Sequence, residues 1–225
     1  MKKTILFCGI LVTMLQGVFA QNNKTNLSLQ VSAAAAANRK QLAGYVWTRT
    51  VQVFIEGTLK NTIVSSLSIG PDGKMVTSAV SSTQTDPPPT RGIRGDIARK
   101  KIAEIKAYVD DAVQVSMGYL YMSKGKMVDY FDAAGISQAG NTISVTGSNV
   151  NKPNDQLAMK LTAGTLAYIS QSFSSTVTSG DAISGTANYK TFSNGLTAFN
   201  DGELNLPAKN IKLMISNTNY AKTLQ

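Results

Sequence analysis

Hydrophobic and polar residues alternate along much of the chain with a period of two, which is the pattern of strands with one buried face. Three runs show it in the first half of the sequence: 45–57, 61–69 and 74–82. In the first run, Tyr45, Trp47 and Val51 share one face. Gly70-Pro71-Asp72-Gly73 favours a tight turn between the last two runs. These runs predict an antiparallel meander.

The same alternation fills the last third of the chain. Seven runs show it: 142–149, 156–162, 166–177, 182–192, 196–199, 204–206 and 210–220. Asn194-Gly195 and Asp201-Gly202 are typical hairpin-turn pairs and separate three of these runs. We therefore predict a second, longer meander with turns at both pairs.

Two regions follow the helical period of 3.6 instead. The first is 22–43, ended by Gly44 and carrying the small, smooth run 33–37, which suits close packing on a sheet. The second is 96–134, where Asp96 is the expected N-cap and Ser123 begins a break between a long and a short helix.

This order of elements predicts an α+β fold. One curved antiparallel β-sheet, an unclosed half-barrel, would cover helices on its concave face, because a sheet of about eight to ten strands curls and must bury its inner side. We expect one domain over 21–225, with a helical insertion at about 96–134.

Residues 1–20 have the features of a secretory signal. Lys2 and Lys3 precede an apolar run from Ile5, and Ala20 ends a segment with small residues where a signal peptidase cleaves. We expect cleavage after Ala20 and export to the periplasm or the medium.

Composition then limits the chemistry of the exported chain. Its 205 residues carry a formal charge of +7 and neither cysteine nor histidine, since Cys8 lies in the signal. Disulfides, thiolate or imidazole catalysis and Cys/His metal sites are excluded. We expect neither a metal nor a cofactor, and a fold held together by burial alone.

The layout resembles the LolA/LolB/LppX-like group of periplasmic carriers. The likeness lies in the opening helix, the strand begun by 45–49, and a late strand at Ala187-Asn188-Tyr189-Lys190 that leads through 194–196 to Leu206-Pro207-Ala208. The resemblance implies a non-enzymatic protein whose half-barrel holds an apolar cavity for a lipid or a lipidated partner. Two features depart from it: the insertion at 96–134 is longer and more charged than expected, and no lipobox is present.

Catalytic motifs are weak. Ser123 and Lys126 fit S-x-x-K, but the companion elements of penicillin-interacting enzymes are absent. Asp110 and Asp111 are adjacent, so on a helix they point about 100° apart and cannot form one acid/base pair. We therefore predict that the protein is not an enzyme.

Methionine and aromatic residues gather around the helical insertion and the first strand. Such side chains adapt to irregular shapes and suit a pocket for a lipid-like ligand, although ordinary core packing would use the same residue types. The candidate ligand-binding residues are Trp47, Tyr119, Met122, Met127 and Phe131.

Positive charge is concentrated between Arg91 and Lys106, after the stiff, extended segment expected at Pro87–Pro89. The candidate anion-steering residues are Arg94, Arg99, Lys100 and Lys101. In the cell envelope, such a segment would attract lipid head groups or an anionic membrane surface, though a solvated helix end would carry the same charges. Nucleic acid is a poorer partner, because export removes it and no aromatic residues interleave with the charges.

Two hypotheses follow. In the first, the protein binds an apolar or amphipathic ligand, or a lipidated partner, between sheet and helices. In the second, it is an interaction protein with a filled core that docks on an anionic envelope component through its basic helix. An apolar pocket of several hundred Å³ would favour the first, and a filled interior the second.

Overall fold

A computed structural model describes residues 3–85 and 92–223 and shows ten strands in one antiparallel sheet. The strands are β1 (Tyr45–Ile55), β2 (Thr58–Ile69), β3 (Met75–Gln84), β4 (Gly135–Ala139), β5 (Thr142–Ser148), β6 (Gln156–Thr162), β7 (Tyr168–Thr176), β8 (Ala182–Thr191), β9 (Thr197–Leu206) and β10 (Ile211–Lys222). Their order is β3-β2-β1-β10-β9-β8-β7-β6-β5-β4, so β10 joins the two meanders and β3 and β4 form the edges. The sheet is therefore open, as expected.

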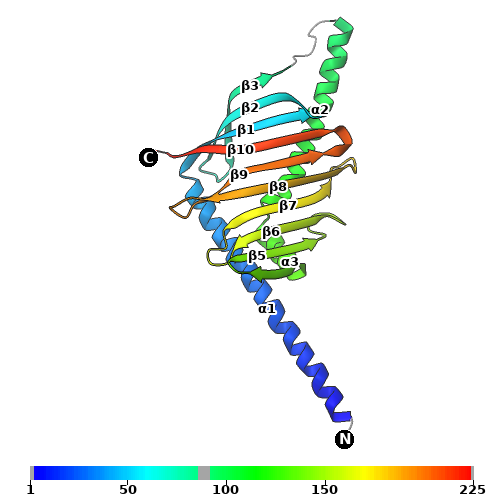
Figure 1. Ribbon diagram of the computed structural model, residues 1–225, viewed down its shortest axis with the longest axis vertical. Coiled ribbons are helices and arrows are strands. Elements are labelled where there is room, and N and C mark those ends of the chain that lie inside the picture. Colours follow the sequence, from blue (N-terminus) through cyan, green and yellow to red (C-terminus); the bar gives the residue numbers. More distant parts are fainter. Residues whose placement is uncertain (1–2, 86–91, 224–225) are drawn as a thin grey trace.

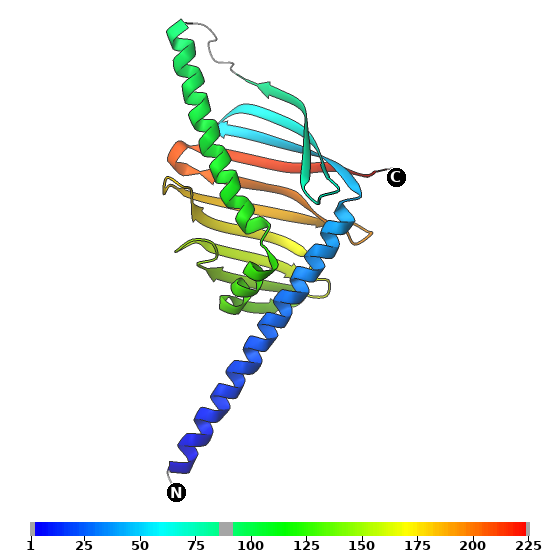
Figure 2. The ribbon, with the colours of Figure 1, turned by 180° about the vertical axis from the view of Figure 1, so that it is seen from behind.

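The helices lie on one face of this sheet (Figures 1 and 2). They are α1 (Lys3–Leu42), α2 (Gly92–Leu120) and α3 (Lys124–Ala133), and a short 3-10 turn, η1 (Pro207–Lys209), precedes β10. In Figure 2, α1 and α2 cross the sheet and approach each other near α3, while the first half of α1 extends beyond the sheet. This is the α+β half-barrel that the sequence predicted. In the part of the chain that is described, no helix combines the length and apolarity needed to span a membrane.

The concave face is packed unevenly. Over β4 to β9 it is closed by α2 and α3, with fully buried side chains such as Phe131, Val145 and Leu161. Over β1 and β2, most residues are only half-buried. The helices thus fill one half of the half-barrel and leave space beside the other.

Specific hydrogen bonds hold α1 against the rest of the molecule. The Asn38 amide donates to the carbonyl of Thr197 (2.6 Å) and accepts from the backbone N–H of Thr197 (2.7 Å). Nearer the start of the helix, Thr25 donates to the carboxylate of Asp132 in α3 (2.8 Å). The second half of α1 is therefore fixed over both β9 and α3.

The prediction of a turn at Asp201-Gly202 is wrong. Both residues lie within β9, where Gly202 pairs with Ala187 of β8 and a register shift follows between Asn188 and Tyr189. A Cβ on Gly202 would overlap the carbonyl oxygen of Thr186. The glycine is required by a close approach of two strands at a bulge rather than by a turn.

Two other boundaries differ from the sequence prediction. Strand β4 was not predicted, because Gly135 was interpreted only as the end of a helix. Helix α2 begins at Gly92, so Asp96 lies inside its first turns and pairs with Arg99 instead of capping the helix. The proline segment at 87–89 lies outside the described residues.

Candidate functional site

A pocket of about 620 Å³ lies in the less filled half of the half-barrel. Its walls are the second half of α1, the concave face of the sheet, and the junction of α2 and α3. The lining includes Ala34, Ala35, Arg39, Trp47, Arg49, Met75, Met122, Lys124, Met127, Asn217 and Tyr220. They come from segments far apart in the sequence, which the β1–β10 pairing brings together.

Small side chains on α1 make the space. The pocket is bordered by Ala34 to Ala37, four consecutive methyl side chains on a helix that is fixed over the sheet. Across the pocket, Trp47 is 2% exposed and its ring stacks on Tyr220 with centroids 5.6 Å apart. Larger residues at the half-buried positions Ala34 and Ala35 would take up part of this space.

One cationic side chain projects from the apolar face of β1. Arg49 faces the same side as Trp47 and Val51, because all three occupy alternate positions of one strand. Its Nε donates to Oδ1 of Asn217 (3.0 Å), and its Nη1 lies 3.9 Å from the sulfur of Met75. Among the described residues, no carboxylate forms an ion pair with Arg49.

A chain of hydrogen bonds orients this arginine. The Nδ2 of Asn217, a side chain 4% exposed, donates to the hydroxyl of Tyr220 (3.1 Å). The Tyr220 hydroxyl in turn donates to the carbonyl of Phe199 (2.6 Å). Burial raises the pKa of Tyr220, against smaller lowering effects of Asn217 and Arg49. The tyrosine is therefore neutral at pH 7 and does not compensate the arginine charge.

The charges found around the pocket have a single sign. Arg39, Arg49 and Lys124 border it, and the described residues of its lining include neither aspartate nor glutamate. Two further tyrosines in the lining, Tyr168 and Tyr189, are neutral: burial raises the pKa of Tyr168 to about 12 and that of Tyr189 well above its usual value. The site thus combines apolar and aromatic side chains with positive charges.

The structure separates the five predicted ligand-binding residues into two groups. Trp47, Met122 and Met127 border the pocket. Tyr119 and Phe131 do not, because both are fully buried in the core under α2 and α3. The contact of any of the five with a ligand remains a prediction.

Tyr119 has a structural partner instead. Its ring stacks on Phe173 with centroids 4.7 Å apart, and its hydroxyl donates to Oδ2 of Asp155 (2.5 Å). Burial and this hydrogen bond raise the pKa of Tyr119 to about 12. Asp155 also accepts from the backbone N–H groups of Val150, Asn151 and Lys152, so this pair fixes the β5–β6 loop to the end of α2.

The basic segment lies at the other end of α2. Arg99, Lys100 and Lys101 are exposed, and the side chain of Arg94 lies outside the described residues. The pocket is bordered by the opposite end of the helix, from Leu120 onward. At 1.5 Å per residue, Lys101 is about 28 Å along the axis from Leu120. Arg99 is already paired with Asp96.

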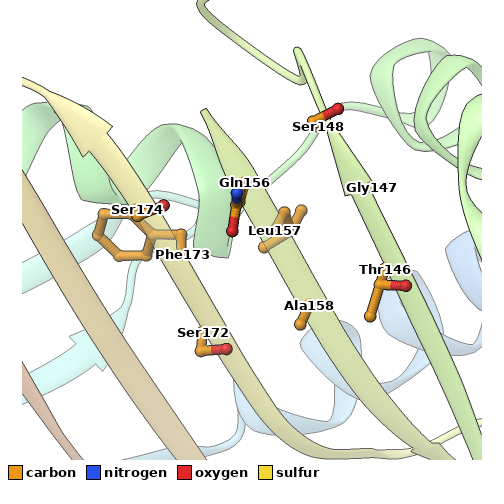
Figure 3. A pocket seen from close by; sticks show the side chains of 9 residues that line it. All are labelled: Thr146, Gly147, Ser148, Gln156, Leu157, Ala158, Ser172, Phe173 and Ser174. Atoms are coloured by element: carbon orange, nitrogen blue, oxygen red, sulfur yellow. The ribbon is translucent and has the colours of Figure 1, made fainter. Parts of the chain in front are cut away.

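A second hollow lies over β5, β6 and β7 (Figure 3). It has a volume of about 470 Å³ and is lined by Thr146, Gly147, Ser148, Gln156, Leu157, Ala158, Ser172, Phe173 and Ser174. None of these nine described residues is charged, and the exposed ones, Thr146, Ser148, Gln156 and Ser172, are polar. It therefore offers no charged group from its described lining to select a ligand.

The Ser123–Lys126 motif does not form a reaction centre. The hydroxyl of Ser123 caps α3 by accepting from the backbone N–H of Lys126 (3.4 Å), and the Lys126 ammonium donates to Oδ1 of Asn151 (2.5 Å). The amine is thus directed to an amide and not to the hydroxyl. In the described part of the chain, no three His, Cys, Asp or Glu side chains gather as a metal site.

Sequence reasoning missed Arg49, Asn217 and the alanine wall. The signal for Arg49 was present, since it stands between Trp47 and Val51 on the face that the period-two pattern marks as buried. A charged residue at such a position is a candidate for function, because burying it without purpose is costly. Asn217 had no comparable local signal.

No family model and no curated protein matches this chain. Among solved structures, it is similar to a DUF1329 family protein from Desulfovibrio piger, with 8% identity and a TM-score of 0.42, over 90% of this chain and 93% of that one. It is also similar to a LolA superfamily protein from Nitrosomonas europaea, with 7% identity and a TM-score of 0.34, over 87% of this chain and 93% of that one. At these values, the likeness concerns the general layout alone.

Proposed function

We propose that the protein binds one apolar or amphipathic small molecule in the pocket between α1 and the sheet, without catalysing a reaction. The observation that carries this proposal is the pocket itself, whose volume of about 620 Å³ lies within the range of about 300–1,000 Å³ typical of ligand sites. A filled core, which the second hypothesis required, would leave no such space.

Binding would be driven by removing an apolar chain from water. Each buried methylene group contributes about 0.8 kcal/mol, so a chain of several carbons in contact with Trp47, Met122 and Met127 would bind without any covalent step. A lipid or the acyl chain of a lipidated partner has this chemistry. Because residues 1–20 have the features of a secretory signal, we place the protein outside the cytoplasm. There, such molecules require a carrier to pass between membranes.

Ala35 offers a direct test, because it borders the pocket on a helix that is fixed at other positions. We expect Ala35→Leu to fill part of the pocket and to reduce the apolar material that co-purifies with the protein from its native envelope. The measurement is mass spectrometry of solvent extracts, scaled to protein amount and compared with an unrelated exported protein.

Ala33→Leu is the matched control. It makes the same change two residues earlier on α1, at an exposed position that does not border the pocket. Its extract should match that of the wild type. An extract from the wild-type protein with no enrichment over the unrelated protein, or one that Ala35→Leu leaves unchanged, would remove the support for a ligand in this pocket.

A second function is favoured by the exposed end of α2. Ile97 is 63% exposed and Ile102 43% exposed, beside the exposed Lys100 and Lys101. Figures 1 and 2 show the first turns of α2 extending past the β3 edge of the sheet. This end is suited to contact an anionic surface, and such docking is compatible with a ligand in the pocket.

A further inference from the structure

We propose that the ligand carries an oxyanion head group, a carboxylate or a phosphate, which binds Arg49 while its chain lies against Trp47 and the alanine wall of α1. This inference rests on the proposed ligand site and specifies its chemistry. It assigns the recognition of the anion to the interior of the pocket and not to the basic end of α2, about 28 Å away along the helix.

The first observation is an arginine whose hydrogen-bonding capacity is largely unused. A guanidinium has five N–H donors in a rigid fork. In the described chain, Arg49 uses its Nε on Asn217, and its terminal nitrogens meet only the sulfur of Met75, a weak acceptor. The fork therefore has donors left for an acceptor that enters the pocket.

The second observation is a buried donor on the same face of β1 as Arg49. The indole Nε1 of Trp47 has no hydrogen-bond partner within the described residues, although the side chain is only 2% exposed. Leaving such a donor unsatisfied costs about 1–3 kcal/mol. Trp47 and Arg49 are two residues apart on one face of β1, so their Cα atoms are about 7 Å apart. An oxygen-rich head group at this place would offer acceptors to both.

The third observation is the sign of the surrounding charge. Arg39, Arg49 and Lys124 border the pocket without a carboxylate in its lining, and Asn217 and Tyr220 hold Arg49 in place. An arginine fork binds carboxylate and phosphate groups with two parallel hydrogen bonds, which are stronger in an apolar site than in water. A cationic or uncharged head group would leave the arginine charge uncompensated.

The single tryptophan of the chain provides the measurement, because Trp47 is itself part of the pocket. Bromine atoms quench indole fluorescence at contact. Three probes with the same brominated sixteen-carbon chain would be titrated into the full protein: the fatty acid, the monoalkyl phosphate and the primary alcohol. We expect the two anions to quench Trp47 at concentrations roughly tenfold or more below that of the alcohol, the value of one charge-assisted hydrogen bond.

Arg49→Leu then tests the named residue. It should weaken binding of both anions by roughly tenfold or more and leave the alcohol unchanged, because only the charged contact is removed. Arg49→Lys should keep part of the preference, since it keeps the charge but loses the fork. Lys160→Leu is the matched control: it removes one positive charge from an exposed position of β6 that does not border the pocket.

The outcomes separate the two proposals. Equal affinity for acid, phosphate and alcohol would overturn the head-group assignment and keep a ligand site. Quenching by none of the three probes would overturn both. A stronger response to the fatty acid than to the phosphate, or the reverse, would support the assignment and identify which source of the oxyanion the pocket takes. A preference that survives Arg49→Leu would contradict the role of Arg49.

Discussion

Asp155 is a buried carboxylate that accepts four hydrogen bonds from the described residues. Its carboxylate is 2% exposed and accepts from the hydroxyl of Tyr119 and from the backbone N–H groups of Val150 (2.6 Å), Asn151 (2.8 Å) and Lys152 (2.8 Å). Burial alone would raise the pKa of Asp155, but these hydrogen bonds outweigh it and lower the pKa. The native fold therefore favours the ionised form.

A pH dependence of stability follows from this direction. A carboxyl whose pKa is lower in the folded than in the unfolded protein contributes stability above its unfolded pKa, and the contribution is lost as the pH falls through the folded value. We expect Asp155→Asn to cost about 2–3 kcal/mol near neutral pH, and the wild type to lose this advantage in acid. Urea unfolding of both proteins between pH 7 and pH 3 measures it.

Asp129→Asn is the control for this prediction, because it removes a carboxylate from an exposed position of α3. Its difference from the wild type should be small over the same pH range. If the difference between the wild type and Asp155→Asn were as large at pH 3 as at pH 7, the stabilisation by the ionised carboxylate would be refuted.

Individual residues show which parts of the site could be predicted from the sequence. Trp47 was found because an aromatic residue on an apolar strand face is a visible signal, and Arg49 was missed although it occupies the same face. Tyr119 was chosen for its amphipathic side chain, yet its hydroxyl is directed to Asp155, thirty-six positions away. A local pattern cannot show which distant group a polar atom will meet.

At the scale of elements, the close packing of β7, β8 and β9 depends on two glycines. A Cβ on Gly202 would overlap the backbone oxygen of Thr186, and one on Gly185 would overlap the ring of Phe173. We expect Gly202→Ala to destabilise the fold by about 2–3 kcal/mol, because strand backbones cannot yield as a flexible side chain can. The change in the midpoint of thermal or urea unfolding measures this cost.

Gly125→Ala is the matched substitution for Gly202. A Cβ there would meet nothing within 4 Å, and the residue lies in the first turn of α3. Alanine should be neutral there or stabilise by about 1 kcal/mol, since it reduces the freedom of the unfolded chain. Similar unfolding midpoints for both variants would show that the β8–β9 approach is not the constraint we describe.

The elements themselves were largely predictable, because period-two and 3.6 patterns depend on neighbours in sequence. The exceptions have a physical cause. Strand β4 carries one half-buried apolar residue, Ile136, and it is an edge strand that pairs only with β5. The interruption at Asp201-Gly202 looked like a turn because a bulge and a turn use the same residues.

At the scale of the whole molecule, the sequence predicted two meanders and their helical cover but not how they meet. The pairing of β1 with β10 joins residues more than 150 positions apart and places Arg49 opposite Asn217. The half-barrel and its concave helices could be foreseen from the need to bury a long sheet. The position of the pocket depends on where α1 crosses that sheet, and only the three-dimensional structure supplies it.

The separation of the pocket from the basic end of α2 makes their roles testable independently. Lys100 and Lys101 are exposed in the first half of α2, so a double change to glutamine should weaken binding to vesicles containing anionic lipid. Because exposed charges are screened beyond about 10 Å at 0.1 M salt, the difference should shrink as salt is added. Sedimentation with anionic and with neutral vesicles measures it.

Lys160 on β6 and Lys190 on β8 are both exposed and provide a control with the same loss of charge. If attraction depended on net charge alone, changing this pair to glutamine would weaken vesicle binding as much as changing the α2 pair. A larger effect of Lys100 and Lys101, with quenching of Trp47 by the brominated fatty acid unchanged in both double variants, would assign docking to the end of α2 and ligand recognition to the pocket. Equal effects of the two pairs would contradict docking through α2, because the summed field of the protein would then be sufficient.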